Sequence, residues 1–371
     1  MSLSKKTLLA LTLASATGLT HANDLQINGF MSVGIGIAPT DDITVTGFDS
    51  DANFSTDTLV ALQISKQINE TTSATTQLVS RGSEAYDTNA AWAYVSYKAD
   101  KNTDVRVGRL RTPFFYYSDF LEVGYAYNWV RPPEEVYRLD AFSSVNGVDL
   151  TRRFSMGSVD GSVQAYFGRF NGPYSVGGST YEFELKNFGG LVTNFSFGDF
   201  GARLSYHQAD VYSDLDPAGG RALDGLLAVA ASLGRADDFD VSGQTSQFIE
   251  AAGTWDNGEY AFVAEYTALR QKSESILDDN AFLVTGAKRL GTTTLHLTYA
   301  SQRDMVEGDS IQKALKSNAQ QHEETYVLGA RYDYDSGTAF KLEAQYQNEK
   351  TINGVDGKSG MLYSAAIDLI F

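Results

Sequence analysis

The sequence contains no cysteine, which excludes disulfide bonds, cysteine-ligated zinc, iron–sulfur clusters and cysteine nucleophiles. It is also short of basic residues, with 29 Lys and Arg against 46 Asp and Glu. The net charge of −17 argues against a nucleic acid partner, because phosphate backbones attract an excess of Lys and Arg. The hydrophobic content of 43% is nevertheless too high for a disordered chain.

Long hydrophobic runs are missing as well. No segment approaches the roughly 18 apolar residues of a membrane-spanning helix, and the best candidate, residues 226–233, is far too short. Residues 1–22 have a different pattern, in which Lys5 and Lys6 precede a short apolar stretch and Ala22 provides a small residue for cleavage. This pattern predicts a secretory signal peptide over residues 1–22 and one mature domain over residues 23–371. An exported chain without spanning helices is either soluble or a β-barrel, because lipid tolerates only helices and closed barrels.

Alternation of apolar and polar residues runs through the mature chain, for example in residues 25–37, 325–334 and 340–347. In the last of these segments the apolar positions are Phe340, Leu342, Ala344 and Tyr346, and the polar ones are Lys341, Glu343, Gln345 and Gln347. A period of two with one apolar face predicts half-buried β-strands.

The connections between these segments alternate in length. Seven short turns and eight longer loops, which include residues 112–143, 172–180 and 211–244, separate sixteen strands. This alternation is typical of outer-membrane barrels. Residues 360–371 form a last alternating strand that ends in Phe371, and it would pair with the first strand because no open edge can remain in lipid. The predicted fold is therefore all-β, a transmembrane antiparallel β-barrel of sixteen strands.

One segment carries a family resemblance. Residues 91–119, AWAYVSYKADKNTDVRVGRLRTPFFYYSD, resemble the general Gram-negative porin family in an AYV strand, a short turn, a strand with a GR motif and a Thr-Pro-aromatic start of the third outside loop. The resemblance implies a sixteen-stranded barrel, usually a homotrimer, with an inward-folded third outside loop that constricts the pore. Residues 124–137 look like a gamma-proteobacterial branch of porin-like proteins. They lack the acidic loop tip usual in general porins, so the family's solute preference is not carried over.

We therefore expect an outer-membrane channel for passive diffusion of small hydrophilic solutes and ions, with no cofactor, metal or catalytic residues. Such a pore needs a narrow, wet and charged cross-section. The basic wall is expected from Arg81, Arg106, Arg109, Arg111, Arg152 and Arg153, and the facing loop carboxylates from Asp119, Glu122, Glu134 and Glu135. Arg109 matches the pore-wall Arg of the family. Strict alternation does not place all six arginines inside, although a bulge at Gly108 would re-aim Arg106 or Arg109.

Aromatic residues are frequent in the same loop and have two interpretations. They would stack on ring-shaped solutes, or they would pack the loop against the inner wall, which we favour because aromatic side chains dominate packing. The residues are Tyr116, Tyr117, Tyr125, Tyr127, Trp129 and Tyr137.

Other functions compete with a general diffusion pore. A substrate-selective channel for anions, sugars or aromatic acids is the main alternative, and an adhesive barrel with a plugged lumen is another. A barrel hydrolase is disfavoured, because His207, His296 and His322 lie far apart in sequence and no G-x-S-x-G is present. Among partners we expect outer-membrane lipid and lipopolysaccharide. Outside acidic pairs such as Asp278 and Asp279 would bind the divalent cations that bridge lipopolysaccharide, or they would belong to solvated loops that keep like surfaces apart. Residues 222–233 would form a short apolar helix that covers the mouth, contacts a neighbouring subunit or packs on its own loop.

Overall fold

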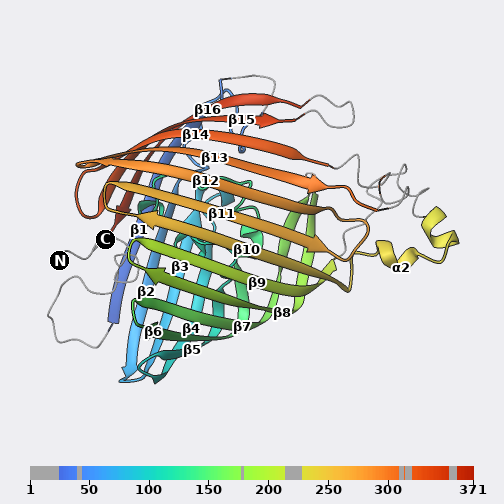
Figure 1. Ribbon diagram of the computed structural model, residues 1–371, viewed down its shortest axis with the longest axis horizontal. Helices are drawn as coiled ribbons and strands as arrows, with labels where there is room; N and C mark the ends of the chain where they lie inside the picture. The colour runs from blue at the N-terminus through green and yellow to red at the C-terminus, as the bar shows by residue number, and fades with distance from the viewer. Residues whose placement is uncertain are drawn as a thin grey trace.

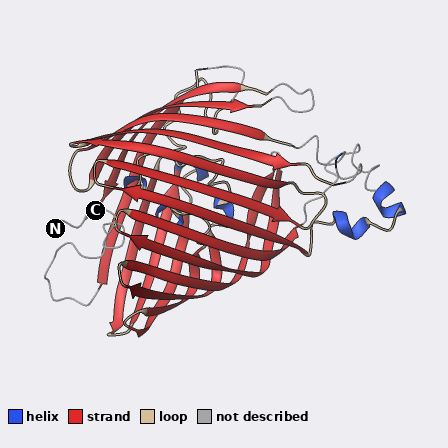
Figure 2. Cartoon of the chain, viewed as in Figure 1, coloured by secondary structure: helices blue, strands red, loops and turns tan. Residues whose placement is uncertain are grey.

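The computed structural model describes residues 25–39, 44–176, 179–213, 228–308, 313, 320–350 and 357–371. Sixteen β-strands form one closed barrel (Figure 1, Figure 2). The barrel closes where β1 (Leu25–Ile37) pairs antiparallel with β16 (Ser359–Ile370), in a register that matches Val33 with Ile367. The predicted sixteen-stranded antiparallel barrel, closed by the last strand on the first, is confirmed.

The remaining strands are β2 (Leu59–Asn69), β3 (Thr72–Arg81), β4 (Thr88–Asp100), β5 (Thr103–Arg111), β6 (Ser144–Met156), β7 (Val159–Val176), β8 (Ser179–Phe197), β9 (Phe200–Ser213), β10 (Gln244–Asp256), β11 (Tyr260–Gln271), β12 (Asp278–Leu290), β13 (Thr293–Met305), β14 (His322–Asp333) and β15 (Thr338–Glu349). Short turns and longer connections alternate between them, as the sequence predicted. The predicted loop at residues 172–180 is wrong, because β7 and β8 continue as a paired ribbon in which Pro173 lies opposite Glu182.

The short turns depend on glycine. Gly157, Gly198, Gly258 and Gly291 have φ values of 64°, 57°, 91° and 64°, which place all four in the left-handed region. Glycine has no Cβ and adopts this region without a steric penalty. These positions allow consecutive strands to reverse direction within a few residues and so fix one end of the barrel.

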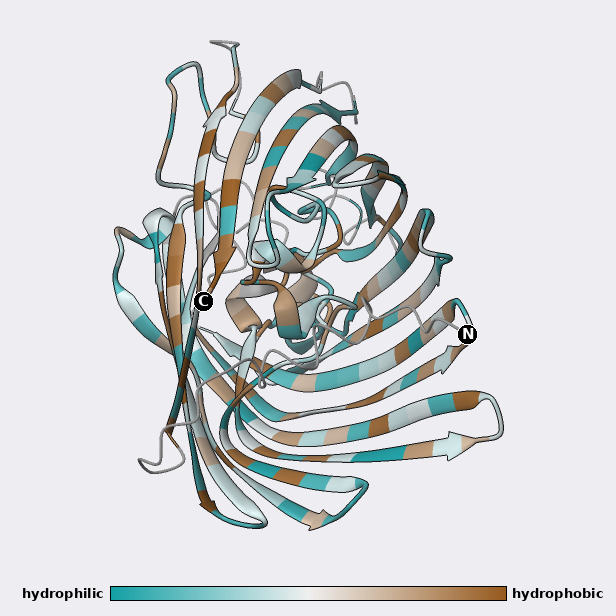
Figure 3. Ribbon diagram, turned by 90° about the vertical axis from the view of Figure 1, so that its left-hand side faces the viewer, coloured by the Kyte–Doolittle hydropathy of each residue, from teal (hydrophilic) through white to brown (hydrophobic). Residues whose placement is uncertain are grey.

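Each strand has an apolar outer face and a polar inner face. On β15, Phe340 and Leu342 are 40% and 63% exposed, whereas Lys341 and Glu343 between them are buried. Hydrophobic and hydrophilic bands alternate along the strands for the same reason (Figure 3). The outer faces supply the apolar surface that lipid requires, and the inner faces supply a polar lumen.

The connection between β5 and β6, residues 112–143, is the longest one that the structure describes completely. It contains three short 3-10 helices, η2 (Ser118–Phe120), η3 (Gly124–Ala126) and η4 (Asp140–Phe142). Figure 3 shows these helices surrounded by the strands. The largest buried apolar cluster of the protein lies where this segment meets the inner faces, with Phe114 and Trp129 from the segment and Phe248 and Leu283 from the wall. We call residues 112–143 the lumen segment.

Two predicted features fall wholly or partly outside the described residues. The signal peptide, residues 1–22, and residues 222–227 of the predicted apolar helix are both in this group. Residues 228–232 are helical and are followed by α2 (Ala236–Phe239), so the later part of the predicted apolar segment does form a short helix. Within the described residues, none of the helices combines the length and the apolar character needed to cross a membrane.

Candidate functional site: the lumen and its segment

A buried lysine on the barrel wall holds the lumen segment by its main chain. The Nζ of Lys341 donates to the carbonyl oxygens of Gly124 at 2.6 Å and Trp129 at 2.5 Å. It also lies 2.8 Å from the carboxylate of Asp368 on β16, which accepts a hydrogen bond from the hydroxyl of Ser32 on β1 at 2.5 Å. The ammonium therefore has three partners, as a buried charge requires. Because its partners on the segment are carbonyls, the contact fixes the path of the segment rather than its sequence.

Neighbouring wall residues hold the segment in the same way. The guanidinium of Arg331 on β14 donates to the carbonyl oxygens of Tyr125 at 2.7 Å and Tyr127 at 2.8 Å. The amide of Val130 donates to Glu343 on β15 at 2.8 Å. Charge-assisted hydrogen bonds of this kind are stronger than neutral ones. Both residues lie on the inner faces of their strands, so these contacts attach the segment to the side of the lumen that β14 and β15 form.

A second attachment centres on Glu265 of β11. Its carboxylate accepts the amide of Tyr116 at 2.9 Å and the hydroxyl of Tyr137 at 2.6 Å. Burial raises the pKa of the Tyr137 hydroxyl well above its usual range, and the adjacent Glu265 charge adds to the effect. Tyr137 therefore remains a protonated donor. Arg203 of β9 donates to the carbonyl of Pro113, so both ends of the segment are bound to this part of the wall.

Most aromatic side chains of the lumen segment pack against the barrel wall and one another, as expected from the sequence. Tyr127, Trp129 and Tyr137 are buried, and the indole Nε1 of Trp129 donates to the hydroxyl of Thr298 on β13 at 2.8 Å. Tyr117 lies edge-on to Trp129, with 5.5 Å between ring centroids. Tyr116 and Tyr125, in contrast, are only half-buried. These rings are therefore largely occupied by contacts with the wall and with one another.

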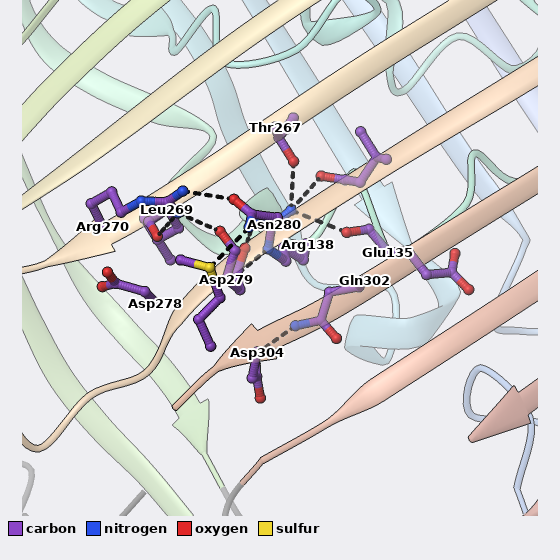
Figure 4. Close-up of polar contacts among 12 residues, drawn as sticks. Glu135, Arg138, Thr267, Leu269, Arg270, Asp278, Asp279, Asn280, Gln302 and Asp304 are labelled. Carbon is purple, nitrogen blue, oxygen red and sulfur yellow. Dashed lines mark hydrogen bonds and ion pairs between the residues drawn. The ribbon is translucent and has the colours of Figure 1, made fainter. Parts of the chain in front are cut away.

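Figure 4 shows the attachment nearest the end of the segment. Arg138 forms an ion pair with Asp279 of β12 and donates to the hydroxyl of Thr267 on β11 at 2.9 Å. Arg138 also donates to the carbonyl of Glu135 at 3.0 Å, which closes a turn of the segment. Asp279, one of the residues suggested for divalent cations on the outside, is buried and therefore does not lie in a solvent-exposed acidic pair. The strand alternation of β12 places Asp279 on the inner face, where the buried guanidinium neutralises it.

Three of the predicted charged residues meet at one point. Glu122 forms ion pairs with Arg81 at the end of β3 and with Arg111 at the end of β5, the latter at 3.2 Å. Burial acts to raise the pKa of Glu122, but Arg111 and Arg81 outweigh it and hold the pKa below its usual value. Glu84 adds a second carboxylate to Arg81 at 3.3 Å. The structure thus brings Arg81, Arg111 and Glu122 together as a locally neutral group.

Arg106 lies on the inner face of β5, facing the lumen. Its Nε donates to the buried carboxylate of Asp149 on β6 at 2.9 Å, and its guanidinium carbon lies 5.6 Å from the centre of the Tyr94 ring. The other oxygen of Asp149 accepts the amide of Gln164 on β7 at 2.5 Å. Asp119 on the lumen segment is exposed, and its charge attracts Arg106 from the facing side. Arg106 and Asp119 are thus a predicted wall charge and a predicted loop charge that act on each other.

Arg109 is placed elsewhere. Its cross-strand neighbours are Ala93 and Asn146, both exposed, and they continue the outward row that contains Val107. Gly108 has a φ of 137°, yet each residue of β5 still faces one residue of β4, so this glycine inserts no extra residue that would turn Arg109 inward. By register, Arg109 falls on the outer face.

Arg152 and Arg153 lie near the short β4–β5 turn. Arg152 donates to the hydroxyl of Thr103 at 2.9 Å and is 3.5 Å from Asp100. Arg153 pairs with Asp104 at 2.5 Å. Both side chains are exposed, and neither contacts the arginines near the other end of the barrel. The six predicted arginines therefore form two pairs, Arg81 with Arg111 and Arg152 with Arg153, and two single members, Arg106 and Arg109.

The last two predicted carboxylates, Glu134 and Glu135, act on a third one that the sequence analysis did not identify, Glu323. Glu134 is exposed and Glu135 is buried. Burial raises the pKa of Glu135, and the hydroxyl of Thr325 partly opposes this effect. The charges of both residues act on Glu323 at the start of β14. The inner-face alternation of β14 would have indicated Glu323, but its proximity to the segment depends on the folded loop.

No group of three or more His, Cys, Asp or Glu side chains suited to a metal ion occurs in the described part of the chain. A closed barrel with an apolar outside and a charged, polar lumen defines a transmembrane β-barrel channel. The chain belongs to the Gram-negative porin family, whose sequence profile matches residues 7–352. It is thus an outer-membrane channel for passive diffusion.

Solved structures share the fold at low sequence identity. The outer membrane channel DcaP of Acinetobacter baumannii is 12% identical, with a TM-score of 0.60 over 96% of this chain and 100% of that one. OmpT of Vibrio cholerae, an outer membrane protein, is 12% identical with a TM-score of 0.59 over 96% and 100%. An anion-selective porin from Comamonas acidovorans is 14% identical with a TM-score of 0.56 over 94% and 99%. No curated protein matches the sequence.

Proposed function

We propose that the lumen segment is the inward-folded third outside loop of a diffusion porin, exported to the outer membrane after removal of residues 1–22. The observation that carries this proposal is the attachment of the segment to the inner faces of the barrel. Its contacts run to Lys341, Glu265 and Arg203 on the β9–β16 side of the lumen. Glu122 of the segment also forms an ion pair with Arg81 at the end of β3. The water-filled passage runs beside the segment, where the charge of Asp119 acts on Arg106 of β5.

Neutral polar side chains on this passage favour small hydrophilic solutes. Gln77 of β3, Ser96 of β4 and Gln164 of β7 belong to the inner rows of their strands. Amide and hydroxyl groups exchange hydrogen bonds with water and with solutes at little cost, so they suit passage without tight binding.

Single-channel recording in a planar bilayer tests this function. Purified, folded protein should insert and give stepwise currents, and a trimer of pores should give steps in groups of three. Replacing Asp119 with Asn should change the current carried per pore, because its charge faces the passage. Folded protein that carries no current would contradict the proposal.

We also propose a homotrimer in which copies meet through the outer faces of β1–β6. Lipid-facing strands of outer-membrane barrels carry aromatic girdles at both interfaces. Exposed aromatic side chains occur on the outer faces of β7–β16, with Phe167, Tyr266 and Tyr326 as examples. On β1–β6 the exposed apolar residues are aliphatic with the exception of Tyr97, and polar Arg109 joins them. The outer face of β1–β6 lacks aromatic girdles and carries Arg109, whose Nε has no hydrogen bond within the described residues. Such a face suits contact with protein better than contact with lipid. One solved OmpT structure of Vibrio cholerae is described as a trimer form.

The absence of cysteine makes this interface straightforward to test. Val148→Cys on β6 and Leu328→Cys on β14 each place one thiol on an exposed outer position. A benzophenone maleimide on each thiol reacts with any chain nearby on illumination. Cross-linked chains are expected from Val148→Cys and not from Leu328→Cys. Equal cross-linking from both positions, or from neither, would contradict this interface.

A substrate-selective channel is the second candidate, and one contact favours it. The hydroxyl of Tyr125 reaches the carbonyl of Asp335 in the short β14–β15 turn, at 3.4 Å. The lumen segment therefore extends to the short-turn end of the barrel and narrows the passage over a length rather than at one ring. Saturable block of the ion current by a sugar or an aromatic acid would support this candidate over a general pore.

A further inference from the structure

A shallow apolar groove lies on the outer surface of the barrel near its short-turn end. Its volume is about 350 Å³, and it crosses β9, β10, β11 and β12, which lie side by side at the front of the barrel in Figure 1. These strands lie outside the proposed subunit interface on β1–β6, so we expect the groove to face lipid. The outward side chains that line it are Phe200, Gly253, Trp255, Phe262, Ala264 and Val284.

The register of the strands explains the shape of the groove. Gly253 of β10 lies opposite Ala202 of β9 and Ala264 of β11, so that small residues meet side by side. A Cβ added at Gly253 would meet no atom within 4 Å, which shows that the space above it is open. Two residues nearer the turn, Trp255 lies opposite Phe262, with 5.8 Å between ring centroids. Small residues therefore form the floor of the groove, and aromatic rings form its rim towards the short turns.

The position of the groove matches the upper acyl chains of one leaflet. Short turns of outer-membrane barrels face the periplasm, and aromatic girdles mark the bilayer interfaces. Phe200, Trp255 and Phe262 form such a band next to the β8–β9 and β10–β11 turns. Gly253 lies two residues further from the turn than Trp255, about 7 Å along the strand, and half of the hydrocarbon core measures about 15 Å. An acyl chain of a lipid in the periplasmic leaflet therefore fits the groove in depth and in polarity.

Charged groups of both signs lie beside the groove at the short-turn end. Lys288 is on the outer row of β12, opposite Tyr260 of β11, and its Nζ lies 5.2 Å from the centre of the Tyr260 ring. Glu259 precedes Tyr260 in the β10–β11 turn, is exposed, and exerts its charge on Lys288. The next residue of β12, Arg289, is on the inner row and pairs with Asp256 at 2.5 Å. The turn therefore offers lipid headgroups one cation, Lys288, and one carboxylate, Glu259.

We propose that this groove binds one phosphatidylethanolamine molecule of the periplasmic leaflet, with an acyl chain over Gly253 and Ala264 and the headgroup at Lys288 and Glu259. The phosphate accepts hydrogen bonds from Lys288 and from the hydroxyl of Tyr260, and the ammonium of the lipid donates to Glu259. Phosphatidylglycerol has the phosphate but no cation, and phosphatidylcholine has a cation without N–H donors. The headgroup with both partners is therefore the one that the two protein charges complement. This inference goes beyond the diffusion function and does not depend on whether the pore conducts.

Trp255 supplies the signal for the test, because the other two tryptophans lie inside the barrel. Trp129 is buried in the lumen segment, and Trp92 is on the inner row of β4, opposite Gln77. The intact protein is reconstituted in phosphatidylcholine vesicles that contain a small, fixed fraction of a lipid brominated in its acyl chains, and the quenching of tryptophan fluorescence is measured. Brominated phosphatidylethanolamine should associate about threefold more strongly than brominated phosphatidylglycerol or phosphatidylcholine with the same chains, the size expected of one exposed ion pair. Trp255→Phe should abolish the difference.

Variants separate the groove from the headgroup contacts. Ala264→Leu fills the floor of the groove and should remove the preference for phosphatidylethanolamine. Ala330→Leu makes the same change on the outer row of β14, opposite the exposed Leu342, and should leave the preference unchanged. Lys288→Gln and Glu259→Gln should each bring the three lipids to nearly equal association. Folding of every variant is checked by its heat-dependent migration in detergent gels, and the two headgroup variants keep the test decisive if Ala264→Leu does not fold.

The outcomes that contradict the inference are distinct. Equal quenching by the three brominated lipids in the wild type would show ordinary lipid contact only, and stronger quenching by phosphatidylglycerol would overturn the headgroup assignment. No quenching by any of them would show that protein rather than lipid covers this face. A preference that survives Ala264→Leu would overturn the role of the groove. Single-channel currents test the diffusion function separately, so a failure of one proposal is not mistaken for a failure of the other.

Discussion

Lys341 and Asp368 form an ion pair inside the barrel, with 2.8 Å between the ammonium and the carboxylate. Both side chains are enclosed, at 0% and 2% exposure. The pair joins β15 to β16 and at the same time holds the carbonyls of Gly124 and Trp129. It connects the closure of the barrel with the position of the lumen segment.

Lys341→Met should therefore be strongly destabilising. It leaves Asp368 buried without its cation and removes the donor from two carbonyls. Breaking one side of a buried pair typically costs about 3–5 kcal/mol. Urea unfolding in detergent measures the loss, and the current of surviving channels should become noisier as the segment loses its anchor. The double variant Lys341→Met/Asp368→Asn should recover part of the stability, since no buried charge is then left alone. An undiminished unfolding free energy for Lys341→Met would show that the pair does not anchor the segment.

Gly124→Ala tests how closely the segment approaches the wall. A Cβ at this position would lie 2.3 Å from the Oδ1 of Asp368 and 2.7 Å from the Oγ of Ser32. Overpacking of this kind costs about 1–3 kcal/mol. The expected result is reduced stability in urea together with a changed single-channel conductance. Gly253→Ala on β10 is the matched control, because its added Cβ meets no atom within 4 Å. Equal behaviour of the two variants would contradict the close packing of the segment.

Tyr137→Phe removes a hydrogen bond to a buried carboxylate without altering the ring. The hydroxyl lies 2.6 Å from Glu265, and hydrogen bonds to charged groups contribute about 1.5–3 kcal/mol. We expect a loss of unfolding free energy in that range. Tyr334→Phe, at a tyrosine that is 66% exposed, should change stability by much less. A loss for Tyr137→Phe no larger than that of the control would argue against the attachment at Glu265.

The free energy of unfolding should depend on pH through Glu135 in a defined direction. Burial raises the pKa of Glu135, and the hydroxyl of Thr325 partly opposes the shift. Glu135 therefore loses its charge at a higher pH than an ordinary glutamate, whose pKa is about 4.3.

The direction of this shift fixes the sign of the effect on stability. A carboxyl group whose pKa is raised by folding stabilises the native state below its unfolded pKa, and this contribution disappears as pH rises through the folded pKa. Mild acid should thus not weaken the barrel through Glu135. Urea midpoints of the wild type and of Glu135→Gln, measured over the same pH series, check this statement. An identical pH dependence of the two midpoints would contradict it.

The barrel could be predicted because the signals for strands and turns lie within short stretches of the sequence. The alternation in residues 340–347 shows directly which side chains face lipid, and turn residues such as Gly291 mark where strands end. Sixteen strands and the alternation of short and long connections follow from these two signals. The β7–β8 loop was placed wrongly because a paired ribbon has the same polar composition as a loop.

The contacts of the lumen were not predictable to the same degree. Lys341 and Gly124 are more than two hundred residues apart, and their meeting depends on the stagger of all the strands between them. Arg109 illustrates the limit of a motif. The resemblance assigns it to the pore wall, whereas the pairing with Ala93 and Asn146 places it on the outward row. One residue of register separates these two positions, and a motif does not determine register.

The attachment of the lumen segment through its carbonyl and amide groups has a consequence for how such channels diverge. Lys341 and Arg331 bind atoms that every residue possesses, so substitutions along the segment leave these bonds in place. Side chains that face the passage, such as Asp119, are then free to change one at a time. The wall preserves the geometry of the pore while the loop sequence varies, and a new solute preference can arise without a new scaffold.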